Sequence, residues 1–141
     1  MGQNMYKITD MPISGQVIVD ALINPEIGAV VTFVGVVRGA TQGRTVQFLE
    51  YEAYPEMAEQ VLAQIGDEVH QQWPDVEDIA IVHRVGHLEI GDTAVVIALS
   101  AAHRRQLFEA LHYAIDRIKI IAPIWKKEVW SDGTGEWKSE L

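Results

Sequence analysis

Residues 28–37 constrain the fold of this chain more than any other segment. They form a nearly continuous apolar run, rich in valine and without a charged side chain. A short run of this composition predicts a buried strand. Burying it requires a core of some size, and a chain of 141 residues, 48% of them hydrophobic, can build one without disulfides or a structural metal. The length suits one domain, so we predict a single domain over residues 1–141.

Strands and helices alternate along the chain at short spacing. Helical spacing of apolar residues, ended by prolines, predicts helices over residues 15–23, 55–73 and 102–121. Runs rich in β-forming residues predict strands over residues 5–9, 28–37, 45–52, 77–84, 93–99, 124–130 and 135–138. We expect two hairpins, one joining 28–37 to 45–52 and one joining 124–130 to 135–138. This order predicts an α+β fold with a largely antiparallel sheet and helices on one side.

Charge and cysteine content exclude several classes of protein. There are 20 acidic and 11 basic residues, and the net charge of −9 argues against non-specific nucleic-acid binding. The absence of cysteine excludes a thiolate nucleophile, a disulfide framework, an iron–sulfur cluster and a cysteine zinc site. The sequence contains no membrane-length apolar run and no signal-peptide core, so we expect a soluble, cytoplasmic protein.

The basic residues are concentrated in one stretch. Residues 104–127 contain six basic and two acidic residues, whereas the rest of the chain has five basic and 18 acidic ones. Solvated helix faces often carry charge, but Lys126 and Lys127 follow a proline and a tryptophan that stiffen the backbone. Arg38 ends the predicted strand 28–37, where a charge can point into a cleft. A basic pocket in an acidic protein indicates a small anionic ligand rather than a polyanion.

Two basic groups belong to opposite ends of the predicted helix 102–121. His103 and Arg104 lie at its start, where free backbone N–H groups and the helix dipole attract anions. Lys119 lies near its end on broadly the same face, about 22 Å away at ~1.5 Å per residue. A small ligand cannot easily touch both ends. If both groups serve one site, the simplest geometry is a symmetric dimer in which each pocket takes one helix end from each chain.

Other patterns point away from phosphate loops and metal sites. The loop over residues 39–45 differs from a nucleotide-binding loop because three residues separate its glycines, arginine replaces lysine, and a strand follows it. His83 and His87 have no nearby carboxylate pattern, and His103 and His112 lie on opposite helix faces. Structural or surface roles suit the histidines better than metal ligation, so we expect no metal and no resident cofactor.

Several segments resemble the large, catalytic subunits of molybdopterin synthases, and the resemblance covers about residues 28–128. Its most specific parts are Ala102-His103-Arg104 with residues 108–110, and residues 119–128, which include Ala122-Pro-Ile-Trp-Lys-Lys. Residues 28–38, 49–58, 83–86 and 91–92 carry the rest. The resemblance implies an α/β-hammerhead with an additional small antiparallel β-subdomain.

The resemblance also implies an activity and partners. The family consists of sulfurtransferases that convert cyclic pyranopterin monophosphate into molybdopterin during molybdenum cofactor biosynthesis. The sulfur comes from the thiocarboxylate on the C-terminal Gly-Gly of a small ubiquitin-like subunit, whose tail enters a pocket of the large subunit. A homodimer of large subunits carries a small subunit at each end, which makes a heterotetramer.

The resemblance assigns residues by position. Lys119 and Lys126 match the catalytic lysines, which also contact the substrate. The pocket for the substrate's anion is matched by Arg38, and by His103 and Arg104 from the neighbouring chain. The remaining substrate-contacting positions are Val36, Val37, Lys127 and Glu128.

The residue chemistry is consistent with this assignment. Arginine and histidine donors suit a cyclic phosphate. Sulfur attack requires proton transfers and stabilisation of an oxyanion at the thiocarboxylate carbon. Two clustered lysines can provide both, because neighbouring positive charge lowers a lysine pKa and makes the neutral amine more accessible. The sequence leaves open which lysine is the base, whether one holds the acyl group covalently, and the order of the two sulfur additions.

Two other functions stay open on the residues alone. A non-catalytic adaptor for a ubiquitin-like tail would need the cleft, but not two lysines beside an anion pocket. A phosphate-ester enzyme would use the basic cluster, although the missing metal-ligand set and phosphate loop weigh against it.

Overall fold

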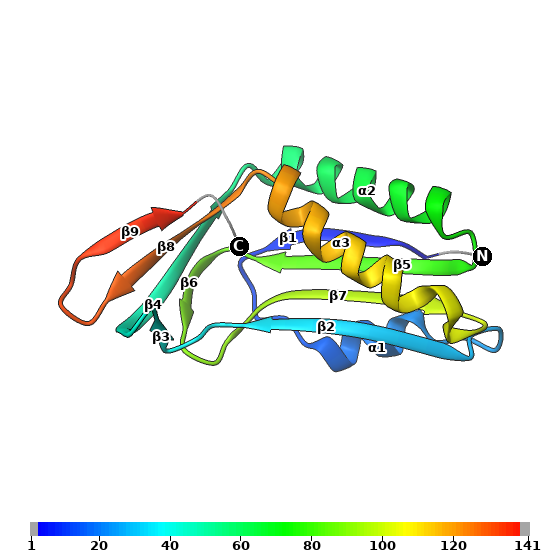
Figure 1. Cartoon of the computed structure of the whole chain (residues 1–141), viewed down its shortest axis with the longest axis horizontal. Helices are drawn as coiled ribbons and strands as arrows, with labels where there is room; N and C mark the ends of the chain where they lie inside the picture. The colour runs from blue at the N-terminus through cyan, green and yellow to red at the C-terminus, as the bar shows by residue number, and fades with distance from the viewer. Residues whose placement is uncertain (1–2, 139–141) are drawn as a thin grey trace.

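The computed structural model describes residues 3–138, which form two sheets and three α-helices (Figure 1). The strands are β1 (Met5–Thr9), β2 (Ala29–Val36), β3 (Ala40–Thr41), β4 (Arg44–Ala53), β5 (Val76–Arg84), β6 (Gly86–Glu89), β7 (Thr93–Ala101), β8 (Ile124–Trp130) and β9 (Gly135–Lys138). The helices are α1 (Gly15–Leu22), α2 (Pro55–Gln72) and α3 (Leu107–Ile121), with a 3-10 turn over Arg104–Gln106. Most predicted elements are therefore confirmed, while β3 and β6 were not predicted.

The larger sheet has the strand order β1-β5-β7-β2. Only the β1–β5 pair is parallel among the strand pairs of residues 3–138, so the sheet is largely antiparallel, as predicted. Strand β7 is apolar on both faces because both are covered: Ile97 packs in the cluster beneath α2 and α3, and Val96 packs beneath α1. The prediction that the helices lie on one side is wrong, since α1 covers the opposite face (Figure 1).

The smaller sheet lies at one end of the larger one and has the order β3-β4-β8-β9, with β6 also paired to β4 (Figure 1). The predicted hairpin of 124–130 with 135–138 is confirmed as β8–β9. The predicted hairpin of 28–37 with 45–52 is wrong. Strand β2 pairs instead with β7 in the larger sheet, while β4 pairs with β3, β6 and β8. The two strands are neighbours in sequence, but they belong to different sheets.

A tight turn accounts for this separation. Thr41 and Arg44 are paired across Gln42 and Gly43, whose φ angles of 51° and 78° are typical of a two-residue hairpin turn. The segment expected to connect the two strands of one hairpin thus contains a hairpin of its own, which starts the second sheet. It also places the Thr41 side chain within hydrogen-bond distance of Glu128 on β8, where it contributes to the site described below.

The fold class is the predicted one: α+β with a largely antiparallel sheet and a second small antiparallel sheet. Helix α3 begins later than predicted, because Arg104–Gln106 form a 3-10 turn before Leu107. Within residues 3–138, no helix combines the length and apolar character needed to cross a membrane.

Candidate functional site

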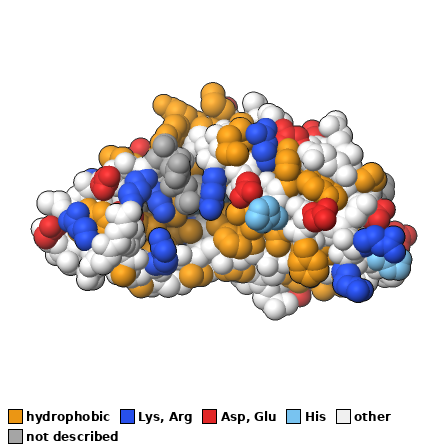
Figure 2. All heavy atoms as spheres, in the orientation of Figure 1, with side chains coloured by type: hydrophobic (Ala, Val, Ile, Leu, Met, Phe, Trp, Pro, Cys, Tyr) orange, Lys and Arg blue, Asp and Glu red, His pale blue; other side chains and the backbone are white. Residues whose placement is uncertain are grey.

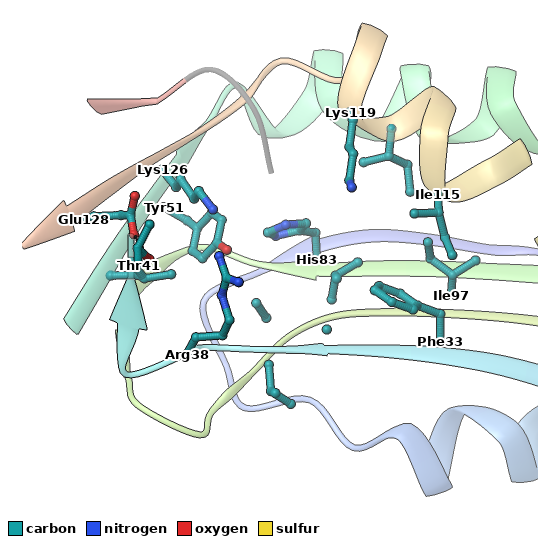
Figure 3. Close-up of a pocket in the computed structure, with 16 residues that line it drawn as sticks. Phe33, Arg38, Thr41, Tyr51, His83, Ile97, Ile115, Lys119, Lys126 and Glu128 are labelled. Atoms are coloured by element: carbon teal, nitrogen blue, oxygen red, sulfur yellow. Dashed lines mark hydrogen bonds between the residues drawn. The ribbon is translucent and has the colours of Figure 1, made fainter. Parts of the chain in front are cut away.

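A cavity of about 350 Å³ opens where the two sheets meet, beneath the end of α3 (Figure 3). Its walls are partly apolar, including Phe33 and Ile97. Polar side chains converge on it from six elements or their ends: Arg38, Thr41, Tyr51, His83, Lys119, Lys126 and Glu128. Its size is within the range of small-molecule sites. The structure therefore brings together four of the predicted residues with charged side chains: Arg38, Lys119, Lys126 and Glu128.

Strand alternation explains how β8 contributes to this cavity. Lys126 and Glu128 are two residues apart, so both side chains project from the same face of the sheet. Tyr51 on β4 is the register partner of Lys126 and lies on that face too. Lys119 reaches the cavity from the last turn of α3, and Figure 3 shows its amine pointing toward the space between the sheets.

The amine of Lys126 lies in an environment that favours its neutral form. Burial is the main cause that lowers the pKa of Lys126 below its ordinary value. Glu128 acts in the opposite direction, whereas the positive charges of Lys138, Arg38 and Lys119 lower the pKa further. A lysine of this kind can exchange a proton nearer to neutral pH than a solvated one.

Glu128 is almost fully buried, with 3% of its surface exposed. Thr41 Oγ1 donates a hydrogen bond of 2.7 Å to its Oε2, and Lys138 Nζ lies 2.5 Å from its Oε1. Burial tends to raise the pKa of Glu128, but these two contacts outweigh it and hold the pKa below its ordinary value. The carboxylate is therefore charged and fixed beside the cavity.

His83 and Tyr51 form a neutral wall of the cavity. His83 is 1% exposed, and its Nδ1 lies 2.7 Å from the carbonyl oxygen of Arg84. Nδ1 is thus the donor in this contact, which leaves Nε2 as an acceptor. Desolvation lowers the pKa of His83 to about 4, and mainly desolvation raises that of Tyr51 to about 12. The rings meet edge-on at 4.9 Å between centroids.

Three of the predicted substrate-contacting residues have different surroundings from one another. Val36 is exposed and lines the cavity. The side chain of Val37 is buried among the apolar residues of the smaller sheet. Lys127 projects from the opposite face of β8, where its Nζ lies 5.8 Å from the ring centroid of Trp137. The side chains of Val37 and Lys127 therefore do not line the cavity in this chain.

His103 and Arg104 lie at the other end of α3, away from Lys119. Together with Arg105 and Phe108 they line a separate, open hollow. Figure 2 shows basic side chains gathered in two places, around the junction of the sheets and at the far end of the molecule. The predicted separation of the two helix ends is confirmed within one chain. A shared site for both ends stays a prediction that needs a second chain.

Sequence reasoning missed Thr41, Tyr51, His83 and Lys138 as parts of the site. The alternation of β4 carried a signal for Tyr51, but only the register with β8 shows which side chain it meets. Among residues 3–138, no group of three or more histidine, aspartate or glutamate side chains is arranged to hold a metal ion. The cavity offers cations for an anionic ligand, a lysine amine suited to proton transfer, and neutral walls for an uncharged ring.

A family model, related sequences and solved structures all match this chain and agree on one family. Residues 8–120 match the family model described as MoaE protein. The molybdopterin synthase catalytic subunit of Halalkalibacterium halodurans is 51% identical over 133 residues, which are 94% of this chain and 85% of that protein. The crystal structure of molybdopterin synthase from Staphylococcus aureus matches with a TM-score of 0.90 at 48% identity, covering 96% of this chain and 98% of the other.

A more distant structure shares the fold. A chain in the complex of subunits 1 and 2 of the molybdopterin-converting factor from Helicobacter pylori matches with a TM-score of 0.74. It is 21% identical and covers 89% of this chain and 85% of its own.

Proposed function

Since the chain belongs to the MoaE family of molybdopterin synthase catalytic subunits, we propose that its cavity is where sulfur is transferred to a pterin precursor of the molybdenum cofactor. The substrate is cyclic pyranopterin monophosphate, and the product is molybdopterin. The observation that carries the proposal is the convergence of Arg38, Lys119 and Lys126 on one partly apolar cavity in a chain of net charge −9.

The sulfur donor is the C-terminal thiocarboxylate of a small ubiquitin-like subunit. A glycine tail has no side chains, so it is the narrowest peptide segment that can enter the cavity. The Helicobacter pylori complex supports a two-subunit assembly, because a chain with this fold occurs there in a complex of two subunits. Positive charge at the cavity favours binding of both the thiocarboxylate and the substrate phosphate.

Lys119 and Lys126 are the groups that carry the reaction in this proposal. The thiocarboxylate sulfur first bonds to the substrate carbon, which makes a thioester. Attack of water on the thioester carbonyl then generates an oxyanion that an ammonium group stabilises, and its collapse breaks the acyl C–S bond, leaves the sulfur on the substrate and releases the tail as a carboxylate. The lowered pKa of Lys126 supports a proton-transfer role for its amine. The apolar wall that includes Phe33 and Ile97 offers a surface against which the uncharged ring of the substrate can pack.

The site is completed by a second copy of the chain. His103 and Arg104 line a hollow of their own, too far along α3 from Lys119 for one small ligand. A symmetric dimer can bring the His103–Arg104 end of one chain to the cavity of the other. With a small subunit on each cavity, the assembly is a heterotetramer.

A reconstituted assay tests this function. The purified chain is mixed with a thiocarboxylated small subunit and cyclic pyranopterin monophosphate, and the pterin product is detected by fluorescence. Lys119→Ala and Lys126→Ala are each expected to lower the rate by ~10²-fold or more without unfolding the chain. Lys7→Ala, which removes an exposed lysine on β1, serves as the matched control and should leave the rate unchanged.

The adaptor alternative predicts a different result in the same assay. An adaptor would bind the small subunit and form no pterin product, and the two lysine variants would differ from the parent chain only in binding. Near-normal product formation by either lysine variant would refute the assignment of that lysine.

A further inference from the structure

Two side chains hold the carboxylate of Glu128, and Lys126, the nearest basic residue on the same face of β8, is not one of them. Thr41 binds Oε2 at 2.7 Å, and Lys138 binds Oε1 at 2.5 Å. Lys126 lies two residues before Glu128 on the same face of β8. Nevertheless, no carboxylate lies within ion-pair distance of Lys126 in the part of the chain that the structure describes.

Strand register explains why Lys138 can take this position. Lys138 on β9 is the register partner of Lys126 on β8, so the two side chains leave the sheet side by side on one face. The ammonium of Lys138 extends along the strands to Glu128, which is only 4% exposed in its side chain. Lys138 thus occupies the carboxylate that would otherwise be available to Lys126.

We propose that Lys138 is a positioning residue for the reaction: by holding the Glu128 carboxylate, it keeps Glu128 from pairing with the Lys126 amine, which stays available to the substrate. The proposal rests on the proposed function only in giving Lys126 a proton-transfer role. Lys138 itself touches neither reacting group in this scheme.

The charges around Lys126 determine the expected effect of losing Lys138. Lys126 is influenced by the negative charge of Glu128 and by the positive charges of Lys138, Arg38 and Lys119, while the neighbouring Tyr51 and His83 are neutral near pH 7. Removing Lys138 deletes one repulsive charge. It also frees Glu128 Oε1 to accept a hydrogen bond from Lys126. Both changes favour the ammonium form.

A purely structural role makes a different prediction. If Lys138 only clamps the end of β9 to β8, its loss weakens the hairpin but leaves the proton equilibrium of Lys126 unchanged. The discriminating measurement is therefore the pKa of Lys126 itself, rather than activity or stability.

The experiment uses the full chain after reductive methylation with ¹³C-formaldehyde. Only five lysines contribute, and Lys126→Arg identifies the resonance of Lys126. In Lys138→Met, the Lys126 pKa is expected to rise by about one unit. Lys7→Met removes the same charge from exposed β1 and should cause no shift. Lys138→Arg retains a cation for Glu128 and should keep the parent value.

A double variant separates the two effects. Lys138→Met combined with Glu128→Gln removes both charges, so the Lys126 pKa should return toward the parent value. An unchanged Lys126 pKa in folded Lys138→Met would overturn the proposal, as would an equal rise in the single and double variants. Circular dichroism on each sample establishes that it is folded.

Activity then gives a second, independent readout. In the assembled enzyme, the rising limb of the pH–rate profile of Lys138→Met should move to higher pH, so that most of the lost rate returns on the alkaline side. If the Lys126 pKa shifts and the profile does not, the positioning role stands and the proton-transfer role of Lys126 fails.

Discussion

Arg104 and Lys119 lie at opposite ends of the same helix, α3, and they line two separate hollows of the molecule. Arg104 lies before its first turn, and Lys119 lies in its last. Neither residue can assist the other within one chain when a small ligand is bound. Either one of the two residues has no role in the reaction, or both serve a site that is shared between two copies of the chain.

Subunit complementation distinguishes these two cases. Arg104→Ala and Lys119→Ala are each expected to be nearly inactive. When the two variants are mixed and allowed to exchange subunits, a shared site should recover about a quarter of the parent activity, because half of the dimers are mixed and each has one intact site. Product formation is measured as above. No recovery after verified subunit exchange would show that the site lies within a single chain.

His83 should make the stability of the chain sensitive to mild acid. Its pKa is about 4 in the folded chain against an ordinary value of 6.5, because burial disfavours the charged ring. The unfolded chain therefore binds the proton more readily between these values, and stability falls as the pH drops from about 6.5 to 4. The full loss amounts to about 3 kcal/mol.

Urea unfolding at several pH values tests this expectation. His83→Gln retains an N–H for the Arg84 carbonyl but cannot titrate, so its stability should change little between pH 7 and 5. The matched control is His112→Gln, at a histidine whose side chain is 81% exposed, and it should keep the parent pH dependence. An identical pH dependence in His83→Gln and the parent would contradict the prediction.

The fold class and most helices and strands could be predicted because apolar periodicity and proline are local signals. Pairing partners could not, because β2 meets β7 across about 65 residues of sequence and no local pattern encodes that choice. The side of the larger sheet on which α1 packs could not be predicted from a local pattern either. It depends on β5 and β7 being apolar on both faces, which suits a helix on either side.

The residues of the site, too, could be predicted only in part. The uneven charge indicated Lys119 and Lys126, the end of a predicted strand indicated Arg38, the resemblance added Glu128 and the residue roles, and the structure places all four around one cavity. His83 gave no signal, because a single histidine in an apolar strand is compatible with many roles. The partnership of Glu128 with Thr41 and Lys138 depends on a hairpin turn and on strand register. The resemblance also implied contacts from Val37 and Lys127, whose side chains point away from the cavity.

Replacing Gly66 in α2 by alanine is expected to destabilise the chain, although the same replacement usually stabilises a helix. Replacing glycine by alanine inside a helix ordinarily stabilises by about 1 kcal/mol. A Cβ at Gly66 would clash with the Tyr6 hydroxyl, which is buried against α2. Gly66→Ala should therefore destabilise the chain by about 1–3 kcal/mol in urea unfolding. Adding Tyr6→Ala to Gly66→Ala should cost less than the two separate losses together. Stabilisation by Gly66→Ala would show that Tyr6 moves freely.

Glu68 joins the two long helices, and its loss should loosen their packing. Its Oε1 accepts hydrogen bonds from Tyr113 Oη at 2.6 Å and Arg117 Nε at 2.8 Å, and its Oε2 accepts one from Arg117 at 3.0 Å. The hydrogen bonds from Arg117 and Tyr113 lower the pKa of Glu68 to about 2. The stabilisation is therefore complete above the ordinary pKa of 4.5 and is lost as the pH falls through 2.

Glu68→Gln should lower the free energy of unfolding by about 1–2 kcal/mol at pH 7, less than the whole pKa shift implies because solvent screens this partly exposed pair. The difference between Glu68→Gln and the parent chain should shrink as the pH falls from about 4.5 to 2, because in this range the unfolded parent takes up a proton on Glu68 that the folded parent does not bind. Asp67→Asn removes one negative charge from an exposed position of the same helix and controls for net charge. A Glu68→Gln deficit that stays constant from pH 7 to 2.5 would mean that shape rather than charge holds the two helices together.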